Sequence, residues 1–158
     1  MFEKYTEDAR RAVFAARLDA GGRRAREIEP AHLLLGVLQQ CEVAPLFAND
    51  IPRVETVRSK IAQGLPVGRE PLPEKADTPL ANASRRILAY AAEESKMMRD
   101  ATIASGHLLL GIHRESGRRR RGILNLLTWP PLPEAVILIE HGADYDTLRT
   151  RLAESKRN

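Results

Sequence analysis

The sequence predicts an all-α fold made of two pseudo-symmetric repeats of about four helices each. The tetrapeptide His-Leu-Leu-Leu followed by Gly occurs at positions 32–36 and again at positions 107–111, an offset of 75 in the numbering. The flanking residues repeat at the same offset, as when Ala16 returns as Ala91. Apolar residues recur at helical spacing in both copies, and no segment shows the alternation of a β-strand. Motif and flanks therefore repeat as one structural unit.

The first repeat is expected over residues 1–63 and contains four helical segments. These segments are expected to begin near Thr6, Pro30, Ala44 and Pro52. Threonine is a favoured N-cap residue, and proline is favoured in the first turn of a helix. The pair Gly21-Gly22 is expected to end the first helix, and the second helix is apolar enough to be mostly buried.

A linker is expected over residues 64–77, where three prolines and two glycines cannot sustain a helix. The second repeat is expected over residues 78–154. It opens with Thr78, read as a cap before a proline, and its last helix begins after Asp144. The final helix echoes the first copy at an offset of 91 instead of 75. The second copy therefore contains a 16-residue insertion, which lies between residues 111 and 145.

Size and composition limit the classes of protein that fit. A chain of 158 residues is typical of one domain, and the single Cys41 cannot form an intramolecular disulfide. The beginning of the chain is charged where a signal peptide needs an apolar run, and no apolar run approaches the ~20 residues that cross a bilayer. We therefore expect a cytoplasmic protein with no membrane segment.

The doubled motif resembles the amino-terminal domain of the Clp ATPases, the double Clp-N motif. The resemblance rests on Phe2, Tyr5 and Thr6 at the opening, an Ala-Arg-Arg segment, and His-Leu-Leu-Leu-Gly at the start of the second helix of each half. It covers essentially the whole chain. The resemblance implies an eight-helix module that binds adaptor proteins and substrate polypeptides and passes them to an ATP-driven unfoldase.

Several chemistries lack support in the sequence. There is no Gly-x-x-x-x-Gly-Lys-Ser/Thr motif, so the chain is not expected to bind or hydrolyse ATP. No metal-ligand spacing occurs, and nothing indicates a catalytic triad. We therefore expect a free-standing binding module, or a fragment of a longer product, that is not an enzyme and needs no cofactor.

The resemblance implies a binding groove between the two halves, lined by the starts of the first two helices of each. The candidate residues for binding a peptide or adaptor are Thr6, Arg10, Ala31, His32, Thr78, Arg85, Gly106 and His107. Clp-C type domains that recognise phosphorylated arginine carry Glu immediately before each motif histidine. Ala31 and Gly106 occupy those positions here, so the guanidinium would lack a counter-charge and we expect negligible phosphoarginine binding. The two motif histidines are expected to be structural, and His113 is expected at the surface.

The insertion supplies a second candidate surface. Its sequence predicts an apolar helical turn near residues 123–127, an extended proline segment, and a helix at residues 134–140. An exposed Trp129 beside Leu126, Leu127 and Leu132 would form an apolar patch, such as a homodimer interface. The alternative is that these side chains pack back onto the second repeat.

The expected partners are a polypeptide substrate, an adaptor protein or a Clp ATPase subunit. The alternative is a small basic nucleic-acid-associated regulator that uses Arg118 to Arg121, because the net charge is +4. The helices mix both charge signs, and the chain has few aromatic residues for stacking on bases. Both features argue against nucleic acid as the partner.

Overall fold

A computed structural model gives the structure of the protein and describes residues 2–69, 77–120 and 130–157. The all-α prediction is confirmed, because these residues form helices and no strand. The elements are α1 (Glu7–Gly22), α2 (Pro30–Leu38), the 3-10 helix η1 (Cys41–Phe47), α3 (Ile51–Gly64), α4 (Asn82–Met97), α5 (Ser105–Arg120), α6 (Pro133–Glu140) and α7 (Tyr145–Ser155).

The motif glycine lets two helices of each repeat approach closely. A Cβ atom added to Gly36 of α2 would lie 2.1 Å from the carbonyl oxygen of Ala12 on α1. A Cβ atom added to Gly111 of α5 would lie 2.5 Å from the carbonyl oxygen of Ile87 on α4. Positions 12 and 87 are related by the same offset as the two motifs, so both helix pairs cross at the same point of the repeat. The sequence repeat is therefore also a packing repeat.

The two repeats are joined by two short parallel backbone pairings that obey the same symmetry. Tyr5, just before α1, pairs with Ile103, just before α5. Ile28, just before α2, pairs with Leu80, just before α4. Because residue 80 is 5 plus the repeat offset and residue 103 is 28 plus that offset, each repeat gives the other an equivalent pairing. The start of each helix pair is thereby fixed by the opposite repeat.

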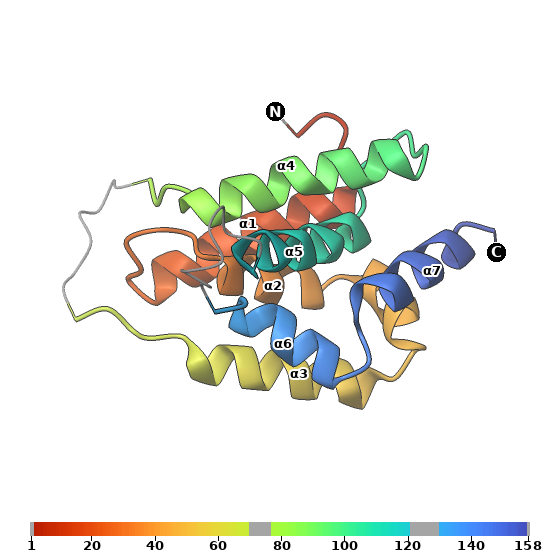
Figure 1. Ribbon diagram of the computed structural model, residues 1–158. Coiled ribbons are helices and arrows are strands. Elements are labelled where there is room, and N and C mark those ends of the chain that lie inside the picture. The colour runs from red at the N-terminus through yellow and green to blue at the C-terminus, as the bar shows by residue number, and fades with distance from the viewer. Residues whose placement is uncertain (1, 70–76, 121–129, 158) are drawn as a thin grey trace.

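The small third helix of each repeat packs on the other repeat. The 3-10 helix η1 contacts α5 and α7, while α6 contacts α2 and α3. Figure 1 shows α3 and α6 side by side along one edge of the molecule, α4 along the opposite edge, and α1, α2 and α5 between them. Buried residues from both repeats, including Leu33, Phe47, Leu109 and Leu148, form one continuous core. The two repeats therefore share one hydrophobic core.

The predicted helix starts agree with the structure at Thr6 and Asp144, and disagree at Thr78. The Thr6 hydroxyl accepts a hydrogen bond from the Ala9 amide, and the Asp144 carboxylate accepts one from the Thr147 amide. The N-cap of α4 is Ala81 instead of Thr78. The prediction for Thr78 was wrong because position 81, not position 78, is the repeat equivalent of Thr6.

The helix at the end of the insertion is confirmed as α6 (Pro133–Glu140). The helix before the insertion, α5, continues to Arg120. Arg118 therefore belongs to the last turn of this helix. The predicted turn at residues 123–127 falls outside the described residues. None of the described helices is both long enough and apolar enough to cross a membrane.

Candidate functional site

The histidine of the repeated motif caps its own helix in both repeats. His32 Nδ1 accepts a hydrogen bond from the Glu29 amide at 2.9 Å, and His107 Nδ1 accepts one from the Ala104 amide at the same distance. Both rings are buried. Because Nδ1 accepts, the proton of each neutral ring is on Nε2. The expected structural role of the two histidines is therefore helix capping. Each imidazole accepts a hydrogen bond from a backbone amide that has no partner within the helix.

The two rings differ at Nε2. His107 Nε2 donates to Asp100 Oδ2 at 2.8 Å, and the Lys156 ammonium contacts the same carboxylate. His32 Nε2 has no hydrogen-bond partner among the described residues, and the nearest carboxylate, on Asp19, is 4.0 Å away. Burial lowers the pKa of both imidazoles, because the charged form would lose its hydration. Both rings are therefore neutral at physiological pH.

Thr6 has a second role besides capping α1. Its hydroxyl donates to the Glu42 carboxylate at 3.2 Å, and the same carboxylate accepts from the Ser105 amide at 2.9 Å. Glu42 thus joins the start of α1, in repeat one, to the start of α5, in repeat two. Arg10 and Arg85 are exposed on α1 and α4.

The two residues before the motif histidines lie in different surroundings. Gly106 is enclosed: a Cβ atom there would lie 2.8 Å from the Leu152 side chain and 3.1 Å from that of Leu46. The structure therefore has no space for a glutamate at this position unless both leucines move. Ala31 is also largely buried, but it lies in the wall of an open groove.

This groove, called the inter-repeat groove below, has a volume of about 320 Å³ and lies between the first turn of α2, the end of α3 and the start of α6. It is lined by Glu29, Pro30, Ala31, Lys60, Ile61, Gly64, Leu65, Leu132, Pro133, Glu134 and Ile137. Two helices of repeat one and one helix of repeat two supply its walls. Most of the lining is apolar, and charged side chains stand among it. Of the eight candidate binding residues, only Ala31 lines this groove.

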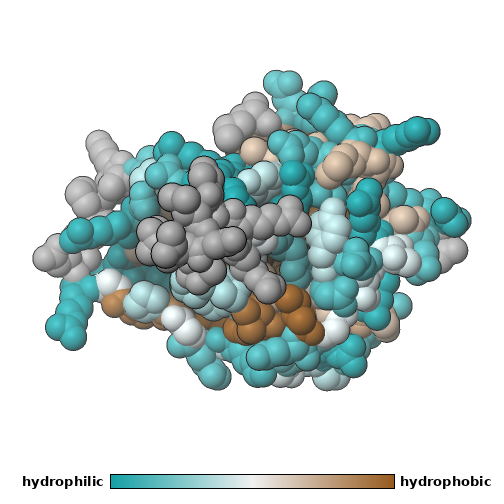
Figure 2. All heavy atoms as spheres, viewed as in Figure 1, coloured by the Kyte–Doolittle hydropathy of each residue, from teal (hydrophilic) through white to brown (hydrophobic). Residues whose placement is uncertain are grey.

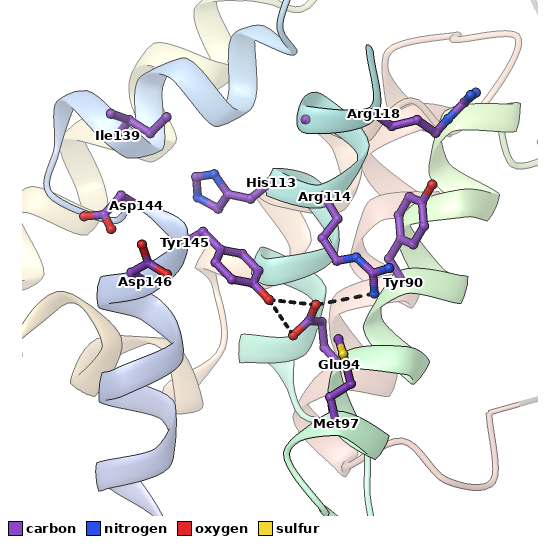
Figure 3. A pocket seen from close by; sticks show the side chains of 11 residues that line it. Tyr90, Glu94, Met97, His113, Arg114, Arg118, Ile139, Asp144, Tyr145 and Asp146 are labelled. Atoms are coloured by element: carbon purple, nitrogen blue, oxygen red, sulfur yellow. Dashed lines mark hydrogen bonds and ion pairs between the residues drawn. The ribbon is translucent and has the colours of Figure 1, made fainter. Parts of the chain in front are cut away.

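A larger pocket, called the α5–α7 pocket below, lies within repeat two and has a volume of about 820 Å³. Its lining residues are Tyr90, Glu94, Met97, His113, Arg114, Gly117, Arg118, Ile139, Asp144, Tyr145 and Asp146. Figure 3 shows α4 and α5 forming one wall and α6 and α7 the other. No candidate residue chosen from the sequence for peptide or adaptor binding lies in this pocket.

A buried carboxylate organises the α5–α7 pocket. Glu94 has a fully buried side chain and accepts hydrogen bonds from the Tyr145 hydroxyl at 2.9 and 3.0 Å. The Arg114 guanidinium lies 3.4 Å from Glu94, bonds Glu93 at 2.7 Å, and stacks 4.5 Å over the Tyr90 ring. These contacts offset the cost of burying Glu94, because a buried carboxylate without partners would be strongly destabilising.

Two other side chains set the polarity of this pocket. The Thr147 hydroxyl and amide hold the pKa of Asp144 below its usual value, so Asp144 is ionised. Burial lowers the pKa of His113, whose Nε2 lies 2.8 Å from the Ala143 carbonyl oxygen. His113 was expected at the surface and is half-buried, because α6 and the turn after it cover part of this face of α5.

The insertion is only partly described. Leu132 is 3% exposed and packs in the core, so it does not contribute to an exposed apolar patch. Its amide also donates to the Ser116 hydroxyl at 3.0 Å, which fixes it against α5. Leu126, Leu127 and Trp129 fall outside the described residues. In the basic run, Arg118 forms an ion pair of 3.4 Å with the buried Glu115, and Arg121 falls outside the described residues.

The described residues contain no group of three or more His, Cys, Asp or Glu side chains that could hold a metal ion. The most prominent feature that the sequence did not indicate is Glu94. It follows another glutamate on an amphipathic helix, and its tyrosine partner is 51 residues away. The sequence spacing of Glu94 and Tyr145 therefore could not predict their contact.

Comparisons with known proteins agree with the resemblance noted in the sequence. Residues 4–126 match the family described as the Clp repeat (R) N-terminal domain. The chain is 32% identical over 133 residues to the chloroplastic chaperone protein ClpD2 of Oryza sativa subsp. japonica, covering 80% of this chain and 14% of ClpD2. It is 30% identical over 140 residues to an uncharacterized protein of Mycobacterium tuberculosis, covering 80% of this chain and 54% of that protein.

Solved structures show the same fold at low sequence identity. The N-terminal domain of the chaperone ClpD from Arabidopsis thaliana is 19% identical, with a TM-score of 0.64 over 100% of this chain and 97% of that one. The Hsp104 N-terminal domain from Candida albicans is 17% identical, with a TM-score of 0.68 over 98% and 92% of the two chains. From the doubled motif, its repeated packing geometry and these matches, we conclude that the chain belongs to the Clp repeat N-terminal domain family.

Proposed function

We propose that this chain is a polypeptide-binding module of the Clp type and that the inter-repeat groove receives an apolar segment of its substrate or adaptor. The observation that carries the proposal is the groove itself, which is open, mostly apolar and built from both repeats. Curated relatives in the family include a chaperone, and an apolar surface that is open to solvent commonly marks a site of contact with another polypeptide. The chain spans only a seventh of the rice chaperone and about half of the mycobacterial protein, so the proposal concerns the domain alone.

Other features of the surface near the groove favour the same role. Val136 and Ile139 on α6 are exposed, although isoleucine and valine are usually buried. Figure 2 shows hydrophobic residues gathered over α6 on the face that it displays. An apolar segment in the groove would extend onto this helix at Val136, whereas Ile139 lines the α5–α7 pocket. The described residues place both motif histidines in capping roles, which favours binding over catalysis as the activity of the chain.

Fluorescence anisotropy tests the proposal. The probe is a fluorescein-labelled lysozyme that has been reduced and carboxymethylated, so that it stays unfolded. We expect saturable binding to the wild-type chain. We also expect Leu65→Asp to weaken it about tenfold, because losing part of the burial of one leucine removes about 1.4 kcal/mol.

The matched control is Val67→Asp, which introduces the same charge two residues later at an exposed position outside the groove. This variant should bind like the wild type. Circular dichroism of both variants establishes that they remain folded. An absence of binding by the folded wild-type chain would refute the polypeptide-binding proposal, and equal weakening by both variants would refute the location.

A further inference from the structure

The α5–α7 pocket has an excess of negative charge. Three carboxylates line it, on Glu94, Asp144 and Asp146, against the two guanidinium groups of Arg114 and Arg118. His113 also lines the pocket and is neutral, because burial lowers its pKa. A group that enters the pocket therefore meets one uncompensated negative charge, although the chain as a whole is basic.

One wall of the pocket already holds a guanidinium group. Arg114 stacks over the Tyr90 ring, and its nitrogens contact Glu93 and Glu94. An aromatic face combined with carboxylates is the combination that stabilises a partly desolvated cation. Arg114 thus shows, within this pocket, which chemistry its walls accommodate.

The opposite wall has similar components, and no arginine or lysine of the described part of α6 or α7 lines the pocket. Figure 3 shows Asp144, Tyr145 and Asp146 together at the start of α7, across the pocket from Arg114 and Arg118. The Asp146 carboxylate is exposed and has no hydrogen bond or ion pair among the described residues, and Asp144 is ionised. The Asp146 carboxylate is therefore available to a ligand, whereas both oxygens of Asp144 accept hydrogen bonds from Thr147.

The rim of the pocket is apolar. Met97 is 52% exposed and Ile139 is 54% exposed, and each lines the pocket. Lysine and arginine side chains bury their aliphatic stems on apolar surface while the charged end reaches a polar environment. The apolar rim would contact the aliphatic stem of such a side chain, and the acidic and aromatic interior would contact its charged end.

From these features we propose that the α5–α7 pocket binds the side chain of an arginine or lysine residue of a bound polypeptide. The cationic end lies against Asp144, Tyr145 and Asp146, and the stem lies on Met97 and Ile139. This site is separate from the inter-repeat groove. The inference rests on the proposed function in one respect, namely that the bound arginine or lysine belongs to a polypeptide. The groove would accept an apolar segment, and the pocket adds a preference for a nearby basic residue.

The equivalent hollow of repeat one provides an internal comparison. It is lined by Ala15, Leu18, Asp19, Gly22, Arg23 and Gln39. Ala15 and Gln39 are the repeat equivalents of Tyr90 and Arg114, and the only carboxylate in this hollow, on Asp19, is paired with Arg23 at 2.9 Å. It therefore lacks both the aromatic faces and a carboxylate without a partner such as that of Asp146. Among the described residues, the expected site is confined to repeat two.

The test is an NMR titration of the 15N-labelled chain with N-acetyl-arginine amide. Amide shifts of the residues lining the α5–α7 pocket should move with ligand concentration, while those of the repeat-one hollow should not. N-acetyl-citrulline amide has nearly the same shape without the charge and should bind at least threefold more weakly. Tighter binding of N-acetyl-glutamate amide or inorganic phosphate, through Arg114 and Arg118, would overturn the proposal.

Variants locate the effect. Asp146→Asn should weaken arginine binding about threefold, since an exposed ion pair contributes less than about 1 kcal/mol, and Asp146→Arg should abolish it. Asp77→Asn is the matched control, because Asp77 pairs with Arg17 outside the pocket. Equal affinity of wild type and Asp146→Arg would overturn the proposal. Binding of the unfolded polypeptide without binding of the arginine probe would refute this inference alone, whereas the reverse result would refute the proposed function.

Discussion

The repeated glycine offers a sharp test of the packing repeat. Gly111→Ala places a Cβ atom 2.5 Å from the carbonyl oxygen of Ile87, about 1 Å closer than an ordinary contact. The obstacle is the backbone of α4, so no side-chain rotation can relieve it and the two helices must separate. Overpacking of this kind costs about 3 kcal/mol at the upper end of the usual range. Alanine recovers about 1 kcal/mol of helix propensity. We therefore expect a net loss of about 2 kcal/mol.

The same helix provides the control. Gly117 also lies in α5, and a Cβ atom there would meet nothing within 4 Å. Gly117→Ala should stabilise the chain by up to about 1 kcal/mol, because only the propensity gain applies. Urea unfolding followed by circular dichroism at 222 nm measures both changes. If both variants shift the urea midpoint in the same direction, the motif does not require glycine because of the close helix crossing.

Three further predictions concern the buried polar groups. Arg86→Met should destabilise the chain by about 2 kcal/mol in urea unfolding, because the fully buried Glu115 carboxylate loses two hydrogen bonds from the Arg86 guanidinium, at 2.7 and 2.9 Å; an unchanged midpoint would contradict this. Tyr145→Phe should cost about 2 kcal/mol, since the hydroxyl donates to the buried Glu94 carboxylate, and Tyr145→Phe as stable as wild type would show that Arg114 alone suffices. Burial lowers the pKa of three histidines, at positions 32, 107 and 113, so the unfolded chain binds more protons than the folded chain just below pH 6.5. The free energy of unfolding should therefore fall between pH 7.5 and pH 5.5, and equal or greater stability at pH 5.5 would contradict the assignment of neutral rings.

The repeat made most of the fold predictable. A motif that returns at an offset of 75, with helical spacing in each copy, indicates two similar helical units, and proline and acidic caps fix where several helices begin. The mistake at Thr78 shows the limit of judging one residue by its type. Threonine before proline is a favourable helix start in isolation, but the pairing of Leu80 with Ile28 extends the chain past it and starts α4 one residue after Ala81.

The candidate site was less predictable, because its contacts join residues that are far apart in the sequence. The groove contains Ala31 but otherwise consists largely of residues from the end of α3 and the start of α6, which meet only because α6 packs on repeat one. Glu94 and Tyr145 come together through the packing of α7 on α5. The motif histidines had the clearest sequence signal, because the motif occurs twice. In the structure both are buried and cap their helices, so the repeated motif reflects a repeated structural role.

The most direct test of the account is to map where an unfolded polypeptide contacts the chain. The 15N-labelled protein is titrated with the carboxymethylated lysozyme, and the amide signals that shift or broaden are assigned. We predict that the affected residues include Ala31, Ile61, Leu65 and Ile137, which line the inter-repeat groove. A saturating titration that leaves these signals unchanged, or one that affects only the exposed face of α1 around Phe14 and Leu18, would contradict the central claim.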